Sequence, residues 1–181
     1  MNIHRNILNG RHPEYFSDGP YLSGIMAGHH ERGLEENGCG CTYKHLFCNG
    51  SDTSRKGSQS IVSERALREI YFKTFEIAIG VQKPTAVMTS YNAINGIYPA
   101  ENADILQTLL RKEWGLESFI MTDWGTYDMV DPVEMVKAGN CWLTEGNGRY
   151  VMALQRTLKS GALSRALLEH NVKYLIQAML K

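Results

Sequence analysis

A short apolar run that ends in an acidic residue decides the predicted fold: Phe119-Ile120-Met121-Thr122-Asp123-Trp124-Gly125. Its bulky and β-branched residues are typical of a short buried strand, and the polar residues after it begin a loop. A helix is predicted beyond that loop, because Asp131 can cap its N-terminus, Pro132 suits the first helical position and Gly139 can end it. This stretch is therefore one strand–loop–helix unit.

The same alternation recurs on both sides of this unit. Cys41–Tyr43, Ala86–Tyr91 and Cys141–Thr144 are further strand candidates, and Met1–Arg5 is another at the N-terminus. The predicted helices lie at 21–37, 63–80, 102–115, 147–160 and 164–181, and the predicted loops at 6–20 and 49–60. Repeated strand–helix units imply parallel strands with right-handed crossovers, which leaves a (β/α) barrel or an open doubly wound sheet.

Composition excludes several classes of function. The chain has 181 residues, 43% of them hydrophobic, with 19 basic and 19 acidic side chains and a net charge of +0. This is globular composition, and it lacks the basic surface that a nucleic acid or an anionic membrane would need. No apolar run is long enough to span a bilayer. Because Met1–Gly19 has no apolar signal-peptide core, the cytoplasm is the predicted compartment.

Neither cysteines nor glycines indicate a cofactor. Cys39, Cys41, Cys48 and Cys141 form no Cys-x-x-Cys pair and are expected to be free thiols in a reducing compartment. No Gly-x-Gly-x-x-Gly or Walker pattern follows a predicted strand, so a nucleotide-binding sheet has no support. The prediction is that the protein uses no metal and no cofactor.

Polar groups stand at the ends of three strand candidates, as Lys44-His45, Tyr91-Asn92 and Asp123-Trp124. In a parallel barrel the C-terminal strand ends form the active-site face, so these residues are candidates for a site. The alternative is structural, with Lys44 and Asp123 as an ion pair or as the starts of solvated loops.

This set of side chains suits carbohydrate chemistry. The Trp124 ring can cover the apolar face of a pyranose, while Arg11, Lys44 and His45 can hydrogen-bond sugar hydroxyls. Nearby cations are expected to hold Asp123 ionised, as a nucleophile requires. Tryptophans at strand ends can also simply cap a core.

Longer motifs carry a family resemblance across essentially the whole chain. They are Asn2–Arg5, Gly10–Ser17, Lys44-His45, Ser63–Tyr71, Met88–Asn92, Met121–Gly125 and Ala138–Asn140. In this order they resemble the first domain of glycoside hydrolase family 3 β-glucosidases. The resemblance implies an α/β fold, a partial (β/α)8 (TIM-type) barrel with about five parallel strands and surrounding helices. Residues 1–181 would be a single domain, the C-terminal portion of the catalytic barrel.

The resemblance also implies the chemistry, which is retaining hydrolysis of O-glycosidic bonds with Asp123 as the nucleophile. The residues that match sugar-binding positions of the family are Arg11, Lys44, His45, Tyr91 and Trp124. A small β-glucoside or related carbohydrate is therefore the expected substrate. The segment Leu46–Gly50 differs from the Pro-Gly-His of the branch that cleaves N-acetylhexosaminides, which favours the glucosidase-like branch.

Some positions depart from the family pattern. Ser17–Pro20 stands where Ser-Glu-Asp-Pro is usual, Cys141 replaces an aspartate, and Thr144-Glu145 replaces Met-Pro. The resemblance places earlier strands, with another sugar-binding aspartate, before Met1. It places the acid/base in a second domain after Lys181. Glu145 is the one strand-end glutamate that could replace that acid.

Two functional hypotheses follow. The first is a glycosidase domain that is weakly active or inactive by itself. The alternative is a non-catalytic sugar-binding or structural remnant of a truncated glycosidase gene. A full barrel takes about 250 residues, so a partial one would expose unpaired strand edges. A homo-oligomer or an edge-paired dimer is therefore predicted.

Overall fold

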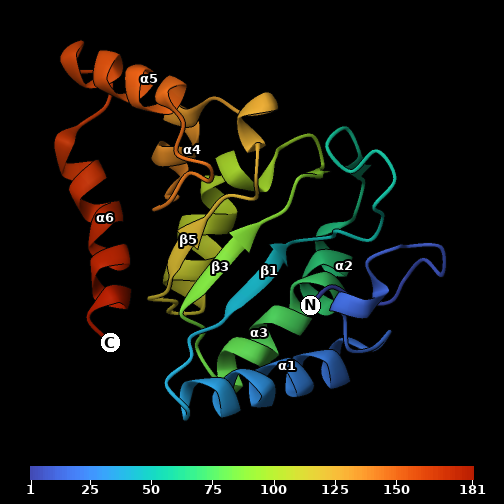
Figure 1. The fold of residues 1–181 in the computed structure, drawn as a ribbon. Helices are drawn as coiled ribbons and strands as arrows, with labels where there is room; N and C mark the ends of the chain where they lie inside the picture. The colour runs from blue at the N-terminus through green and yellow to red at the C-terminus, as the bar shows by residue number, and fades with distance from the viewer.

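The computed structural model describes residues 1–181 as helices around a parallel sheet (Figure 1). The strands β1 (Thr42–Leu46), β3 (Ala86–Thr89) and β5 (Phe119–Met121) pair in the order β1-β3-β5. All pairs are parallel, and the register places Met88 beside both Lys44 and Met121. The C-terminal ends of the strands therefore meet at one edge of the sheet.

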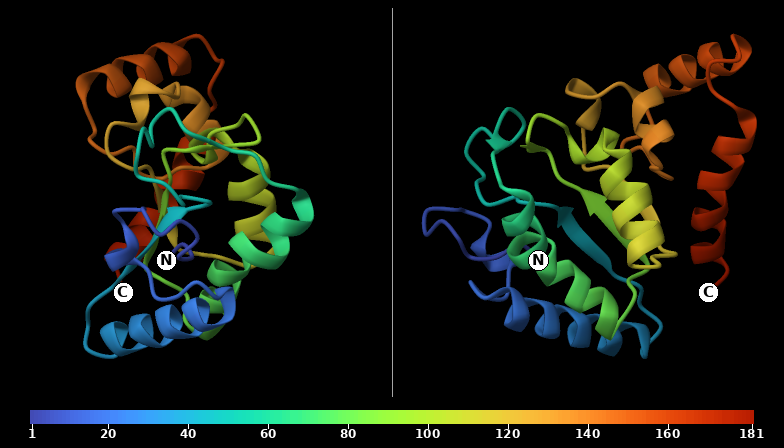
Figure 2. Two further views of the ribbon diagram at one scale, coloured as in Figure 1. Left: turned by 90° about the vertical axis from the view of Figure 1, so that its right-hand side faces the viewer. Right: turned by 180° about the vertical axis from the view of Figure 1, so that it is seen from behind.

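Helices connect the strands and surround them. They are α1 (Pro20–Glu35), α2 (Glu64–Ala66), the π-helix η2 (Leu67–Tyr71), α3 (Lys73–Val81), the π-helix η4 (Asp104–Glu113), α4 (Pro132–Ala138), α5 (Gly148–Lys159) and α6 (Arg165–Met179). Helix α1 packs along α3 below the sheet (Figure 1). Seen from behind, η4 covers the sheet and α6 stands at its outer side (Figure 2).

Short elements complete the chain. They are the 3-10 turns η1 (His12–Glu14), η3 (Pro99–Glu101) and η5 (Thr126–Asp128), and the paired parallel strands β2 (Gln59–Ser60) and β4 (Ala93–Ile94). No helix is long and apolar enough to cross a membrane. The four cysteines form no disulfide bond. No group of three or more His, Cys, Asp or Glu side chains could hold a metal ion.

Local capping chemistry sets most helix ends where the sequence predicts them. The Asp131 carboxylate accepts a hydrogen bond from the Val133 amide at 2.8 Å, and Gly139 ends α4 with a φ of 113°. Asn147 and Ser164 cap α5 and α6 through their side chains in the same way. The helical stretch from residue 64 differs from expectation, because it runs through Gly80 to Val81.

The core lies between the sheet and the helices behind it. Phe47 is fully buried at its centre, with its ring centroid 4.6 Å from that of Phe72 and 4.7 Å from that of Phe75. The Trp114 ring meets Phe47 edge-on at 6.1 Å. This aromatic cluster directly follows the end of β1, so it fixes the strand that carries Lys44 and His45.

The α/β class and the partial barrel are confirmed, and the barrel is not closed. Two strand predictions are wrong in detail. Cys141–Thr144 forms only an isolated parallel bridge, between Met121 and Trp142. Met1–Arg5 forms no strand, because its hydrogen bonds go to separate places: the terminal amine donates to the Lys44 carbonyl and the His4 amide to the Ser17 carbonyl.

Candidate active site

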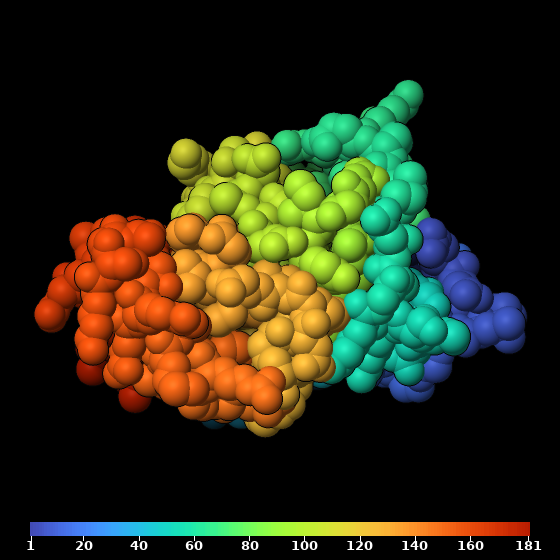
Figure 3. Space-filling view, turned by 90° about the horizontal axis from the view of Figure 1, so that it is seen from above, coloured from blue at the N-terminus to red at the C-terminus, as the bar shows by residue number.

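The C-terminal edge of the sheet gathers the residues that the sequence singles out. Lys44 and His45 lie on β1, Tyr91 follows β3, and Asp123 and Trp124 follow β5. Arg11 directly precedes η1 and reaches the same edge. Seen from above, the segments after β1, β3 and β5 lie side by side on this face (Figure 3).

Asp123 and His45 approach each other from different strands at this edge. Asp123 Oδ2 lies 3.4 Å from His45 Nε2, and Asp123 Oδ1 accepts a hydrogen bond from the Trp124 amide at 2.7 Å. The Asp123 side chain is only 14% exposed, and that of His45 is buried. One oxygen of the carboxyl group therefore accepts a hydrogen bond, the other lies against His45, and a small part of the side chain remains open to solvent.

His45 is a neutral imidazole in this setting. Burial, with help from the positive charges of Arg11 and Lys44, lowers the pKa of His45 to about 2. Asn49 Nδ2 lies 3.4 Å from His45 Nδ1, and Arg11 Nη2 lies 3.3 Å from His45 Nε2, so a hydrogen-bond donor faces each ring nitrogen. The contact between His45 Nε2 and Asp123 Oδ2 is therefore one between a neutral ring and a carboxyl group.

The protonation of Asp123 differs from expectation. Burial raises the pKa of Asp123, although the Trp124 amide, the Tyr91 hydroxyl and the charges of Arg11 and Lys44 each pull it down. The sequence predicts that the cations dominate, but the loss of solvent around the carboxyl group has the larger effect on its pKa.

The alternative interpretation of Lys44 and Asp123 as a structural ion pair is wrong, because Lys44 pairs with another carboxylate. Lys44 Nζ lies 3.8 Å from Glu14 Oε2. Arg11 shares that carboxylate, at 2.8 Å, and lies 3.7 Å from Asp52 Oδ1. The two cations are thus held by carboxylates of loops and turns, and both stay close to His45 and Asp123.

Tyr91 links two of the strand ends. Its hydroxyl donates to the Trp124 carbonyl oxygen, next to the Asp123 carboxyl. Burial and the negative charge of Asp123 raise the pKa of Tyr91, so the phenol remains protonated and can donate. The ring of Trp124 is 62% exposed and presents an apolar surface at the same edge.

Sequence reasoning missed two cations over Tyr91. The Arg55 guanidinium carbon lies 5.1 Å from the centre of the Tyr91 ring, and Lys56 Nζ lies 5.5 Å from it. Lys56 also pairs with Asp128 at 2.8 Å. A signal was present, since the loop 49–60 directly follows Lys44-His45 and therefore starts at the active-site edge.

Glu145 lies at the rim of this group. Its Oε1 is 3.6 Å from the position that a Cβ on Gly125 would take, and Lys56 Nζ is 3.1 Å from that position. Gly125 has a φ of 71°, so glycine serves both the turn and the close approach of Lys56. Glu145 itself is exposed.

The arrangement can bind a polyhydroxy ligand. It offers charged, imidazole and phenol donors, a partly buried carboxylate that can act as a nucleophile, and an exposed aromatic face. These are the groups that a pyranose ring needs for hydrogen bonding, stacking and attack at its anomeric carbon.

Comparison with known proteins gives a consistent result. Residues 1–178 match the family described as "Glycosyl hydrolase family 3 N terminal domain". A β-glucosidase of Ruminococcus albus is 40% identical over 193 residues, which cover 99% of this chain and 20% of that protein.

Solved structures agree with the sequence comparison. β-Glucosidase 3B of Thermotoga neapolitana, in complex with glucose, superposes with a TM-score of 0.93 at 42% identity, over 99% of this chain and 26% of that one. A GH3 β-glucosidase of Bifidobacterium adolescentis gives 0.92 at 34% identity, over 98% of this chain and 26% of that one. The chain thus spans about a fifth to a quarter of the length of these relatives.

Proposed function

Since the chain belongs to glycoside hydrolase family 3, we propose that it carries the nucleophile side of a retaining β-glucosidase site, with Asp123 as the nucleophile. The observation that carries the proposal is the Asp123 carboxylate at the end of β5, with its Oδ2 3.4 Å from His45 Nε2. The matches to β-glucosidases support a β-glucoside as substrate.

The proposed reaction has two steps. An Asp123 oxygen attacks the anomeric carbon, and the bond from that carbon to the leaving oxygen breaks, giving a glycosyl ester on Asp123. Water then attacks the anomeric carbon of the ester and frees Asp123, so the configuration is retained. The His45 ring, which lies against Asp123 Oδ2, would hold the nucleophile in the direction of attack.

Positioning of the sugar is assigned to the side chains around Asp123. Arg11, Lys44, His45 and Tyr91 would donate to its hydroxyls, and Trp124 would cover its apolar face. A solved relative from Thermotoga neapolitana holds α-D-glucose, which supports a monosaccharide of this size. Asp52 and Glu14 would act indirectly, by fixing Arg11.

The group that this site supplies least well is the general acid. A retaining glycosidase needs a second carboxyl group about 5–5.5 Å from the nucleophile to protonate the leaving oxygen. Glu14 and Asp52 are paired with Arg11, and Glu145 is exposed at the rim. We therefore propose that these 181 residues alone turn over only substrates whose leaving groups need little acid assistance.

The test compares two substrates. A dinitrophenyl β-glucoside is expected to be cleaved slowly and cellobiose not measurably, because only the disaccharide needs a strong acid. Asp123→Asn should remove the activity toward the aryl glucoside, while Glu36→Gln, an exposed change on the helix side, should leave it unchanged. Equal rates for wild type and Asp123→Asn would contradict the assignment.

A non-catalytic, sugar-binding remnant is the second candidate, favoured by the lack of a placed acid next to Asp123. It predicts glucose binding without turnover of either substrate. The edge-paired dimer also remains a proposal, supported by the open sheet. It predicts a dimer mass in light scattering, and a monomer at all concentrations would contradict it. The cytoplasmic compartment stays a prediction.

A further inference from the structure

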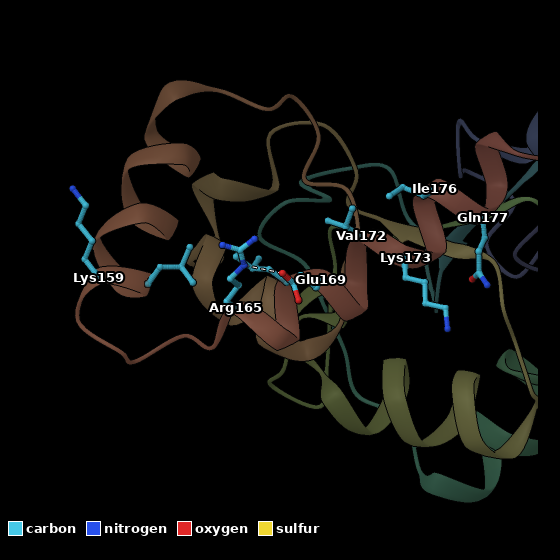
Figure 4. Close-up of a pocket in the computed structure, with 9 residues that line it drawn as sticks. Lys159, Arg165, Glu169, Val172, Lys173, Ile176 and Gln177 are labelled. Atoms are coloured by element: carbon cyan, nitrogen blue, oxygen red, sulfur yellow. Dashed lines mark hydrogen bonds and ion pairs between the residues drawn. The ribbon is translucent and has the colours of Figure 1, made fainter.

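The largest groove of the protein lies away from Asp123, along α5 and α6, and has a volume of about 820 Å³ (Figure 4). Its floor is apolar and is made by Leu158 of α5 with Leu168, Val172 and Ile176 of α6. Val172 is 41% exposed and Ile176 49% exposed, so a continuous apolar strip faces solvent. Strips of this kind mark interaction surfaces.

The opposite face of α6 is firmly attached to the rest of the domain. The buried Asn171 amide donates to the Val136 carbonyl at 2.8 Å and to the Asn140 carbonyl at 3.2 Å. The Arg111 guanidinium lies 3.7 Å from the centre of the Tyr174 ring. Because α6 is held through these residues, its apolar strip cannot turn inward, and the groove is a lasting feature of the surface.

The shape of the groove indicates a helical partner. Leu168, Val172 and Ile176 are spaced four residues apart and form one ridge along α6, the kind of ridge that packs against a second helix. In a (β/α) arrangement each helix packs between two neighbours. Helix α6 contacts α4 on one side, and no helix covers the groove.

The charged residues that line the groove indicate which residues should flank the apolar stripe of the partner helix. Glu169 is neutralised by Arg165, whose Nε lies 2.7 Å from Glu169 Oε1. Lys159 and Lys173, which also line the groove, form no ion pair. A second copy of α6 would bring cations onto cations, whereas acidic residues would complement both lysines.

We propose that the α5–α6 groove binds an amphipathic helix whose apolar stripe is flanked by Asp or Glu residues. The relatives are about five times longer than this chain, so family members contain many further segments that could supply such a helix. The proposal concerns a surface remote from Asp123 and does not depend on the proposed glycosidase activity.

The test uses a fluorescent synthetic peptide of about five helical turns, with leucines at positions i, i+3, i+4 and i+7 and glutamates on both flanks. A twin peptide carries lysines in place of the glutamates. Fluorescence anisotropy with the full chain should show saturable binding of the Glu peptide and at least about tenfold weaker binding of the Lys twin. Equal affinity for the two peptides, or no binding of either, would overturn the proposal.

Variants locate the binding surface. Val172→Ser with Ile176→Ser should weaken binding of the Glu peptide at least about tenfold, whereas Ile61→Ser, at a 77% exposed position elsewhere, should not change it. Lys173→Glu leaves the apolar strip intact and should narrow or reverse the preference for the Glu peptide. If Ile61→Ser weakens binding of the Glu peptide as much as the groove variant does, the assignment of the binding site to the groove is wrong. A wild-type dimer that only the groove variant dissociates would also overturn the proposal, since a second copy would then fill the groove.

Discussion

His45 Nε2 on β1 lies 3.4 Å from Asp123 Oδ2 beyond the end of β5, so the two side chains meet across the sheet. Because burial lowers the pKa of His45 to about 2, the pair is a neutral imidazole facing a carboxyl group rather than two opposite charges. The contact therefore orients Asp123 without neutralising its charge, which is what a nucleophile requires.

Stability should depend on pH through His45. The folded pKa is lowered from 6.5 to about 2, so the unfolded chain binds more protons as the pH falls below about 6.5. The free energy of unfolding should then fall by up to about 1.4 kcal/mol per pH unit. Urea unfolding at pH 7.5 and 5.5 measures this slope. His45→Gln should flatten it, and an unchanged slope in His45→Gln would contradict the assignment.

Lys56 and Asp128 should hold the loop 49–60 against the turn after β5. Their pair is about half exposed, so breaking it should cost at most about 1 kcal/mol of stability. Lys56→Met and Asp128→Asn should each speed hydrogen exchange of residues 50–58, and the swap Lys56→Asp with Asp128→Lys should restore much of the protection. Lys137→Met, which breaks the Lys137–Glu134 pair on α4, is the matched control. If Lys137→Met speeds hydrogen exchange of residues 50–58 as much as the Lys56 and Asp128 variants do, the proposed role of the Lys56–Asp128 pair is refuted.

Glu31 should destabilise the protein at neutral pH. It is fully buried in α1, and neither carboxyl oxygen has a hydrogen-bond partner that meets the distance and angle of a normal bond. Burial, with the negative charge of Glu35, raises the pKa of Glu31, although the neighbouring Cys41 lowers it. The folded state then binds the proton more tightly, so the contribution of Glu31 to stability is present below about pH 4.5 and is lost as the pH rises through the folded pKa.

Glu31→Gln should therefore raise stability at pH 7 by about 1 kcal/mol, on the scale of one unsatisfied buried group. Glu36→Gln, at an exposed position next to the same helix, should change it by less than about 0.5 kcal/mol. Urea denaturation measures both. If Glu31→Gln lowers the stability at pH 7, the Glu31 carboxylate stabilises the folded protein and the prediction is wrong.

Phe47 should be the most costly core position to truncate among the residues near the site. It is fully buried among Phe72, Phe75 and Trp114, so Phe47→Ala should lower the free energy of unfolding by about 3–5 kcal/mol. Ile61→Ala, on the surface, should stay within about 0.5 kcal/mol. Equal midpoints of urea unfolding for Phe47→Ala and Ile61→Ala would contradict this role of Phe47 in the core.

Short-range signals in the sequence predict much of this fold. The apolar runs at Ala86 and Phe119 form strands, and Asp131 and Ser164 cap helices, because these choices depend on neighbouring residues. Cys141–Thr144 has the same strand-like composition and forms one bridge only. Composition cannot show that a strand lacks a partner on its outer side.

The sequence predicts those residues of the site whose position depends only on where the strands end. Parallel strands bring Lys44-His45, Tyr91 and Asp123 to one edge whatever the loops do. Arg55 reaches Tyr91 through the path of a loop, and the raised pKa of Asp123 depends on how deeply the carboxyl is buried. Both are long-range properties that no local pattern carries.

Covalent labelling of Asp123 is the most direct test of the central claim. The chain is incubated with 2,4-dinitrophenyl 2-deoxy-2-fluoro-β-glucoside, whose good leaving group makes acid assistance unnecessary, and then digested for mass spectrometry. We expect one added fluoroglucosyl group on the peptide that contains Asp123, slower labelling in His45→Gln and none in Asp123→Asn. Labelling of another residue, or equal labelling of Asp123→Asn, would contradict this expectation.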